Sequence, residues 1–150
     1  MSRLTIGIDP GCGGGICELW DGKEPVLHAM MDEPDLRDFF YSRGIAQDYA
    51  TEVYLEQVGG YIGKPQPGPA MFTFGNRYGF IRGLLSANRI KTVLVRPQTW
   101  QKGIPGLQGV KGADRKRAMK EHASRLYPNS KITLKTADAL LIADFGSKQP

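Results

Sequence analysis

Three acidic residues occupy positions from which carboxylates can do chemistry. Asp9 ends a predicted strand over residues 4–9, Glu56 ends another over residues 52–56, and Asp138 stands near the start of an apolar C-terminal helix. Carboxylates at the ends of apolar strands lie at the rim of a sheet, where water and ligands reach them. If the fold brings the three together, they form an anionic cluster suited to divalent metal ions.

Metal held by such a cluster is well suited to phosphodiester chemistry. Two divalent ions about 4 Å apart can stabilise both the attacking and the leaving oxygen of a phosphoryl transfer. Each carboxylate also has a simpler interpretation. Asp9 can be a turn residue before a proline, Glu56 a surface charge, and Asp138 a residue that favours the N-terminal dipole of its helix.

Length and composition predict a single domain over residues 1–150. No apolar run approaches the ~18 residues of a membrane span. The first residues run directly into a strand, so we expect no signal peptide. Cys12 and Cys17 make no zinc set with other residues, and we expect reduced thiols in a cytosolic protein. A formal net charge of +5 favours a polyanionic partner such as nucleic acid.

Periodicity and turn residues predict the order of elements. Three strands form an antiparallel meander, followed by a helix, a strand, a helix, a strand and two helices. The expected ranges are 4–9, 16–20, 25–31, 33–43, 52–56, 69–87, 92–96, 113–127 and 136–145. This order predicts an α/β fold: a five-stranded mixed sheet, with three antiparallel strands and then two parallel ones, flanked by helices.

The second predicted helix carries a regular row of glycines. Gly75, Gly79 and Gly83 recur every four residues and would let another backbone approach closely. This row faces either the core or a second subunit.

Three motifs resemble the successive motifs of the RuvC family of Holliday junction resolvases, in the RNase H-like superfamily. They are Ile6-Gly-Ile-Asp9-Pro-Gly11, Leu55-Glu56-Gln57-Val58 and Ala137-Asp138-Ala-Leu140. The resemblance extends over nearly the whole chain, and the compact, glycine-rich chain is most similar to phage-type members. It implies an RNase H-like fold in a protein of the cytoplasm of a bacterium or phage-infected cell. It also implies a homodimeric crossover junction endodeoxyribonuclease that makes paired nicks in four-way DNA junctions. Asp9, Glu56 and Asp138 would hold up to two Mg²⁺ or Mn²⁺ ions per site.

The sequence departs from the family pattern at two places. The family commonly has a fourth acidic residue one helical turn before the last aspartate, where this chain has Lys135. We expect Lys135 on the same helix face as Asp138, as a candidate catalytic residue that pairs with a carboxylate, contacts the scissile phosphate or is merely solvated. Resolvases also often place a wedge aromatic three residues after the glutamate. Here that residue is Gly59, and Tyr61 is the nearest aromatic candidate.

Basic residues supply the expected DNA-binding surface, through phosphate contacts that do not depend on sequence. The alternative for each is a solvated helix face or a surface loop. Trp100 is expected to be a packing anchor, and His28 and His122 to be structural or surface residues. The candidate DNA-binding residues are Tyr61, Lys64, Arg77, Lys102, Lys111, Arg115 and Lys116.

The resulting expectation is a metal-dependent, structure-selective endonuclease acting on branched DNA. Two alternatives remain open. One is a nuclease of the same fold that acts on flaps, other branched DNA or RNA. The other is a junction-binding protein whose catalysis is weakened by Lys135.

Overall fold

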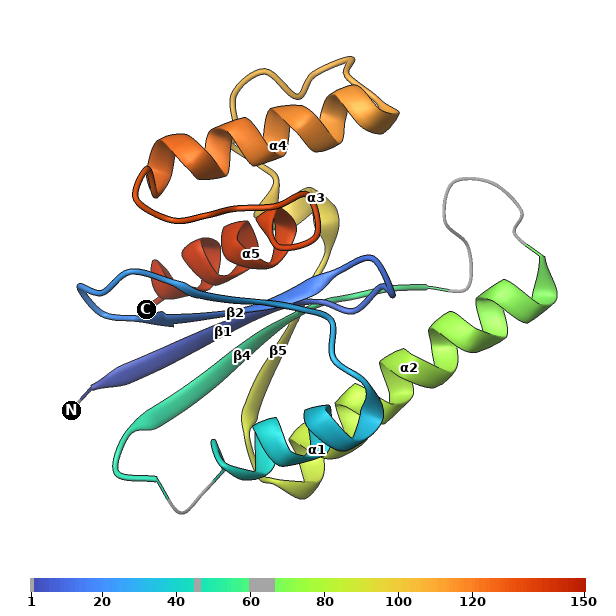
Figure 1. Ribbon diagram of the computed structural model, residues 1–150, viewed down its shortest axis with the longest axis vertical. Helices are drawn as coiled ribbons and strands as arrows, with labels where there is room; N and C mark the ends of the chain where they lie inside the picture. The colour runs from blue at the N-terminus through green and yellow to red at the C-terminus, as the bar shows by residue number, and fades with distance from the viewer. Residues whose placement is uncertain (1, 45–46, 60–66) are drawn as a thin grey trace.

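A mixed β-sheet forms the centre of the structure, a computed structural model that describes residues 2–44, 47–59 and 67–150 (Figure 1). The sheet has five strands in the order β3-β2-β1-β4-β5. In chain order the elements are β1 (Arg3–Asp9), β2 (Gly15–Trp20), β3 (Val26–Ala29), α1 (Glu33–Tyr41), β4 (Ala50–Glu56), α2 (Gly68–Ala87), β5 (Lys91–Val95), α3 (Pro97–Trp100), α4 (Gly112–Leu126) and α5 (Ala137–Ser147).

The pairing of the strands confirms the expected topology. β1 pairs with β2, and β2 with β3, in antiparallel ladders. β1 then pairs with β4, and β4 with β5, in parallel ladders. The short helix α3 was not predicted, because four residues after a proline carry too little periodicity to be recognised.

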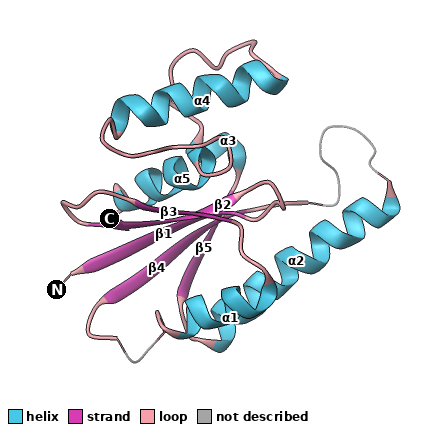
Figure 2. Ribbon diagram, in the orientation of Figure 1, coloured by secondary structure: helices cyan, strands magenta, loops and turns pink. Residues whose placement is uncertain are grey.

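Helices cover both faces of the sheet. α1 and α2 lie on one face, and α5 lies on the other with α3 and α4 beyond it (Figure 2). Leu4, Ile6 and Ile8 of β1 are fully buried in the cluster that includes residues of α1 and α2. Because successive side chains alternate between faces, the intervening Thr5 and Gly7 face the layer of α5.

Gly7 allows α5 to lie directly on the central strand. A Cβ atom at this position would overlap the carbonyl oxygen of Ala139 and the backbone nitrogen of Ala143. Gly146, at the other end of the helix, packs equally closely on the ring of Tyr54. The small residues therefore set how near the C-terminal helix comes to β1 and β4.

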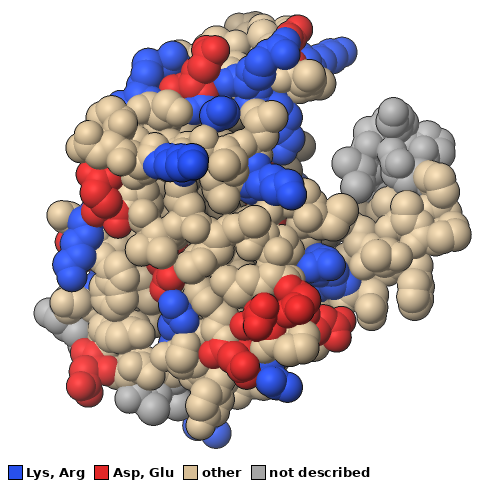
Figure 3. All heavy atoms as spheres, viewed as in Figure 1, with Lys and Arg blue, Asp and Glu red and all other residues tan. Residues whose placement is uncertain are grey.

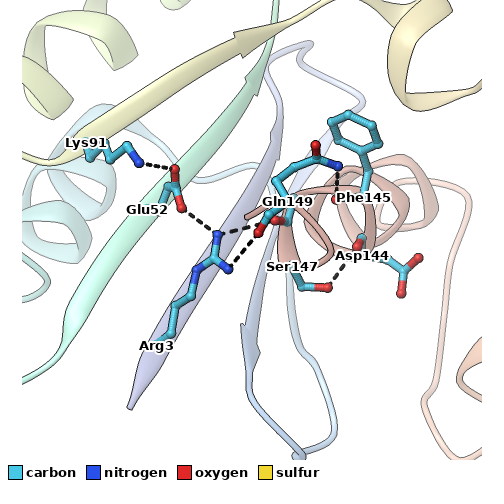
Figure 4. Close-up of polar contacts among 8 residues, drawn as sticks. Arg3, Glu52, Lys91, Asp144, Phe145, Ser147 and Gln149 are labelled. Carbon is cyan, nitrogen blue, oxygen red and sulfur yellow. Dashed lines mark hydrogen bonds and ion pairs between the residues drawn. The ribbon is translucent and has the colours of Figure 1, made fainter. Parts of the chain in front are cut away.

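A partly buried ion-pair network fixes the end of the sheet where β1 and β5 begin (Figure 4). Glu52 of β4 accepts a 2.6 Å hydrogen bond from Arg3 of β1 and lies 2.7 Å from the ammonium of Lys91 in β5. Arg3 also donates to the carbonyl oxygen of Gln149 at the end of the chain. The network ties three parallel strands to the segment after α5.

The glycine row of α2 faces away from the core. Gly75, Gly79 and Gly83 are exposed, and a Cβ atom at any of them would meet nothing within 4 Å. Of the two expectations for this row, packing against the core is therefore wrong. In the part of the chain that the structure describes, no helix is both long and apolar enough to cross a membrane.

Candidate active site

The parallel pairing of β1 and β4 brings two of the predicted carboxylates to one end of the sheet. Ile8 is paired with Leu55, so Asp9 and Glu56 are the next residues of adjacent strands. Asp138 lies in the first turn of α5, which packs across β1, and its side chain is only 9% exposed. The fold therefore brings together the three acidic residues that the sequence singled out.

The carboxylates are close enough to disturb one another's ionisation. Burial, reinforced by the charge of Asp9, raises the pKa of Glu56 to about 7. The pKa of Asp9 is also raised, first by burial and then by the charge of Asp138. Two effects oppose this rise at Asp9: the charge of Lys116 and the backbone N–H of Gly11, which donates to Oδ1 over 3.4 Å. Such a cluster resists carrying its full negative charge without a cation.

Lys116 supplies a cation to the cluster. Its Nζ donates a 2.6 Å hydrogen bond to Asp138 Oδ2 from the second turn of α4. Burial by itself would lower the pKa of Lys116, but this bond, the charge of Asp138 and the charges of Asp9 and Glu56 raise it overall. The lysine is therefore held in its charged form. Its expected role was DNA binding, and the structure shows it bound to the acidic cluster.

Glu56 has a second partner in Trp100. The indole Nε1–H of Trp100 donates to Glu56 Oε2 over 2.8 Å. Trp100 is 3% exposed and belongs to the core cluster on the α5 face. The expected packing role is confirmed, while the hydrogen bond to the site was not expected, because no local pattern links an indole to a carboxylate 44 residues away.

The three carboxylates are chemically suited to a hard divalent cation, but their arrangement is not that of a complete metal-binding site. Carboxylate oxygens are the ligands that Mg²⁺ prefers. One of them, Asp138 Oδ1, is buried and has no hydrogen-bond partner among the described residues. Within residues 2–44, 47–59 and 67–150, however, no three His, Cys, Asp or Glu side chains are grouped so that they could hold a metal. The arrangement is that of an acidic site whose Asp138 is paired with Lys116.

Lys135 does not lie where the sequence analysis expected it. It precedes α5, in the turn before Thr136 and Ala137, and its side chain is exposed. Its carbonyl oxygen packs against Gly15, where a Cβ atom would come within 2.8 Å. Among the described residues, no ion pair links Lys135 to Asp138, whose carboxylate is paired with Lys116.

Apart from Lys116, the candidate DNA-binding residues divide into three groups. Lys102 and Lys111 are exposed, as expected for such a role. Arg115 instead donates to the carbonyl oxygens of Leu107 and Val110, so it braces the loop before α4. Arg77 donates to the carbonyl oxygen of Met31, while Tyr61 and Lys64 lie outside the described residues.

Lysines and arginines gather over the region of α4 on the face seen in Figure 3. Those of the helix itself are Arg115, Lys116, Arg117, Lys120 and Arg125. The only acidic side chains on the same helix are Asp114, which pairs with Arg117, and Glu121. A positive surface therefore borders the acidic site.

Comparison with solved structures identifies the fold. The chain is similar to the RuvC structure of Thermus thermophilus, with a TM-score of 0.57 and 14% identity over 98% of this chain and 93% of that one. The fold is that of RuvC. A structure of T. thermophilus RuvC in complex with a Holliday junction substrate is also similar, with a TM-score of 0.60 and 10% identity. That match covers 97% of this chain and 92% of the other.

The similarity to RuvC is a similarity of backbone structure, since the sequences share few residues. No family model matches the chain, and no curated protein sequence matches it. The expected RNase H-like architecture is confirmed by the structural match.

Proposed function

We propose that this protein is a metal-dependent endonuclease that cleaves four-way DNA junctions. The observation that carries the proposal is the meeting of Asp9, Glu56 and Asp138 at one end of a RuvC-like sheet, beside a basic helix. One of the similar structures contains RuvC with a Holliday junction substrate, which suggests the substrate class.

Asp9, Glu56 and Asp138 are the residues that would hold the metal. A divalent cation bound there would supply Lewis-acid activation of water and of the scissile phosphate. Lys116 would stay in its charged form beside Asp138, where it could also donate to a phosphate oxygen of the substrate.

Lys111 and Lys102 are exposed and would contact the DNA backbone. Such contacts position the substrate without reading its sequence. Arg115 contributes indirectly, because it fixes the loop that leads into α4.

We further propose that the protein acts as a homodimer through α2. The exposed glycine row of this helix lies on the same face as Phe72, whose side chain is 76% exposed. Three or four residues separate neighbours on one face of a helix, which aligns residues 72, 75, 79 and 83. An exposed aromatic beside small residues suits close packing against a second copy of the helix.

The decisive experiment is Asp9→Asn, assayed on a synthetic four-way junction with Mg²⁺ or Mn²⁺. Nicking should fall by at least about 100-fold, as expected for loss of a metal ligand, while junction binding in EDTA stays within a few-fold of the wild type. Asp38→Asn is the control, since Asp38 is exposed and pairs with its neighbour Arg37. Undiminished metal-dependent nicking by Asp9→Asn would overturn the assignment.

A junction-binding protein with weakened catalysis is the second candidate. The pairing of Lys116 with Asp138 favours it, because the lysine occupies an oxygen that a metal would need. The same assay separates the two functions: this candidate predicts tight junction binding with no nicking in either metal. Competition with flaps and RNA–DNA hybrids would define the substrate further.

A further inference from the structure

We propose that Trp100 is a positioning residue for Glu56. Its indole N–H holds Oε2 of the carboxylate at 2.8 Å, which fixes the orientation of the carboxylate plane and leaves Oε1 to other partners. This inference rests on the proposed function, in which Glu56 is one of the residues that hold the metal.

The backbone around both residues is firmly placed. Glu56 is paired with Val95, the last residue of β5, and the N–H of Gln57 donates to the carbonyl oxygen of Val95 over 2.8 Å. Pro97 then begins α3, where its fixed φ suits the first turn of a helix. One turn of helix after the strand therefore brings residue 100 back towards the end of β4.

Packing holds the indole in its place. Trp100 is 3% exposed, and its core cluster also contains Leu140, Leu141 and Ala137 of α5, the helix that carries Asp138. A buried ring of this size has little freedom to change rotamer. The N–H therefore points at Glu56 before any ligand binds. Because the Trp100 side chain is already ordered, metal binding does not have to reduce its conformational entropy.

The hydrogen bond from Trp100 both orients the Glu56 carboxylate and stabilises its charge. A hydrogen bond to an ionised acceptor is stronger than one between neutral groups. A donor outside the metal-binding groups commonly contributes about 10-fold or more to metal affinity by orienting a ligand. The hydrogen bond of Trp100 goes to Glu56, so its effect should pass through that carboxylate.

The test is a mutant cycle on Mn²⁺ binding, measured by calorimetry or by paramagnetic resonance of free Mn²⁺. Trp100→Phe keeps an aromatic ring and removes the N–H donor. It should weaken Mn²⁺ binding about 10-fold in the wild-type background and cause no further loss in a Glu56→Ala background. Nicking should drop at low Mn²⁺ and return to within a few-fold of the wild type at saturating Mn²⁺. Trp20→Phe is the matched control, because the Trp20 ring packs on Tyr49.

Two results would overturn the positioning role while leaving the proposed function intact. One is unchanged Mn²⁺ binding by Trp100→Phe alongside weakened binding by Glu56→Ala. The other is an equal loss from Trp100→Phe in both backgrounds, which would mean a general packing effect. If Glu56→Ala itself changes neither Mn²⁺ binding nor nicking, the proposed site fails, and the role of Trp100 fails with it.

A second measurement on the unaltered tryptophans applies even if Trp100→Phe does not fold. The chain has two tryptophans, so its amide correlation spectrum contains two indole N–H signals, which Trp20→Phe assigns. Addition of Mg²⁺, and the variant Glu56→Gln, should each shift the Trp100 signal and leave that of Trp20 in place. A Trp100 signal that responds to neither change would contradict the proposal.

Discussion

Lys116 Nζ lies 2.6 Å from Asp138 Oδ2, which joins α4 to the first turn of α5 across the acidic site. This ion pair has consequences both for stability without metal and for metal affinity. The lysine partly neutralises a cluster that includes Asp9 and Glu56. It also occupies an oxygen that a cation would use.

Lys116→Met should destabilise the metal-free protein and tighten metal binding. The expected loss in the free energy of unfolding in EDTA is about 1 kcal/mol, reduced from that of a fully buried pair because the lysine side chain is 49% exposed. Mn²⁺ should stabilise the variant more than it stabilises the wild type, because the metal no longer competes with an ammonium. Denaturant unfolding with and without Mn²⁺ measures both effects. Lys120→Met, about one turn along the same helix, is the control, and equal behaviour of the two variants would contradict the prediction.

Glu56 should make the metal-free protein less stable as pH rises. Its pKa of about 7 in the folded state exceeds the ordinary value of 4.5, so folding favours the protonated form. This contribution is fully present below about pH 4.5 and is lost as pH rises through about 7. Glu56→Gln should remove the loss and be more stable than the wild type by about 3 kcal/mol at pH 8, at about 1.4 kcal/mol per pKa unit between 4.5 and about 7.

Glu52→Gln provides a control of opposite sign. Although burial alone would raise the pKa of Glu52, its bonds and ion pairs with Lys91 and Arg3 lower it overall. Folding therefore favours the charged form, and Glu52→Gln should destabilise the protein at pH 8. Urea unfolding across the pH range in EDTA tests both variants. The same slope with pH in Glu56→Gln and the wild type would count against the raised pKa.

Gly7→Ala should damage both the fold and the site. The added Cβ atom would overlap backbone atoms of Ala139 and Ala143, so α5 must move away from β1. We expect a loss of about 3 kcal/mol in the free energy of unfolding, at the upper end of the range for overpacking. Nicking should fall as well, because Asp138 moves with its helix. Gly13→Ala, at an exposed position where a Cβ atom meets nothing within 4 Å, should stay within about 0.5 kcal/mol of the wild type.

Gly79→Arg should prevent dimerisation without unfolding the chain. The position is exposed and has open space around it, so the single chain tolerates a long side chain. Sedimentation should show a dimer for the wild type at micromolar concentration and a monomer for the variant. Ser124→Arg places the same side chain on the exposed surface of α4 and should remain dimeric. A wild type that sediments as a monomer would contradict the proposed interface.

Local sequence signals are sufficient to predict the order of the elements and to place the acidic residues at their ends. Alternating apolar residues set β1, and Asp21-Gly22 set the turn after β2, where Gly22 has φ 70°. Strand ends follow from such local signals, and parallel strands must end at the same edge of a sheet. These signals place Asp9 and Glu56 at strand ends, while the parallel pairing of β1 with β4 brings the two residues together.

The contacts of the acidic residues with other side chains depend on the packing of distant elements. Lys116 contacts Asp138 and Trp100 contacts Glu56, while Lys135 lies outside the helix and Arg115 braces a loop. Each of these outcomes depends on how elements far apart in the chain pack against one another. Local periodicity describes the direction of a side chain on its own element, and it carries no information about the partner that packing brings to it.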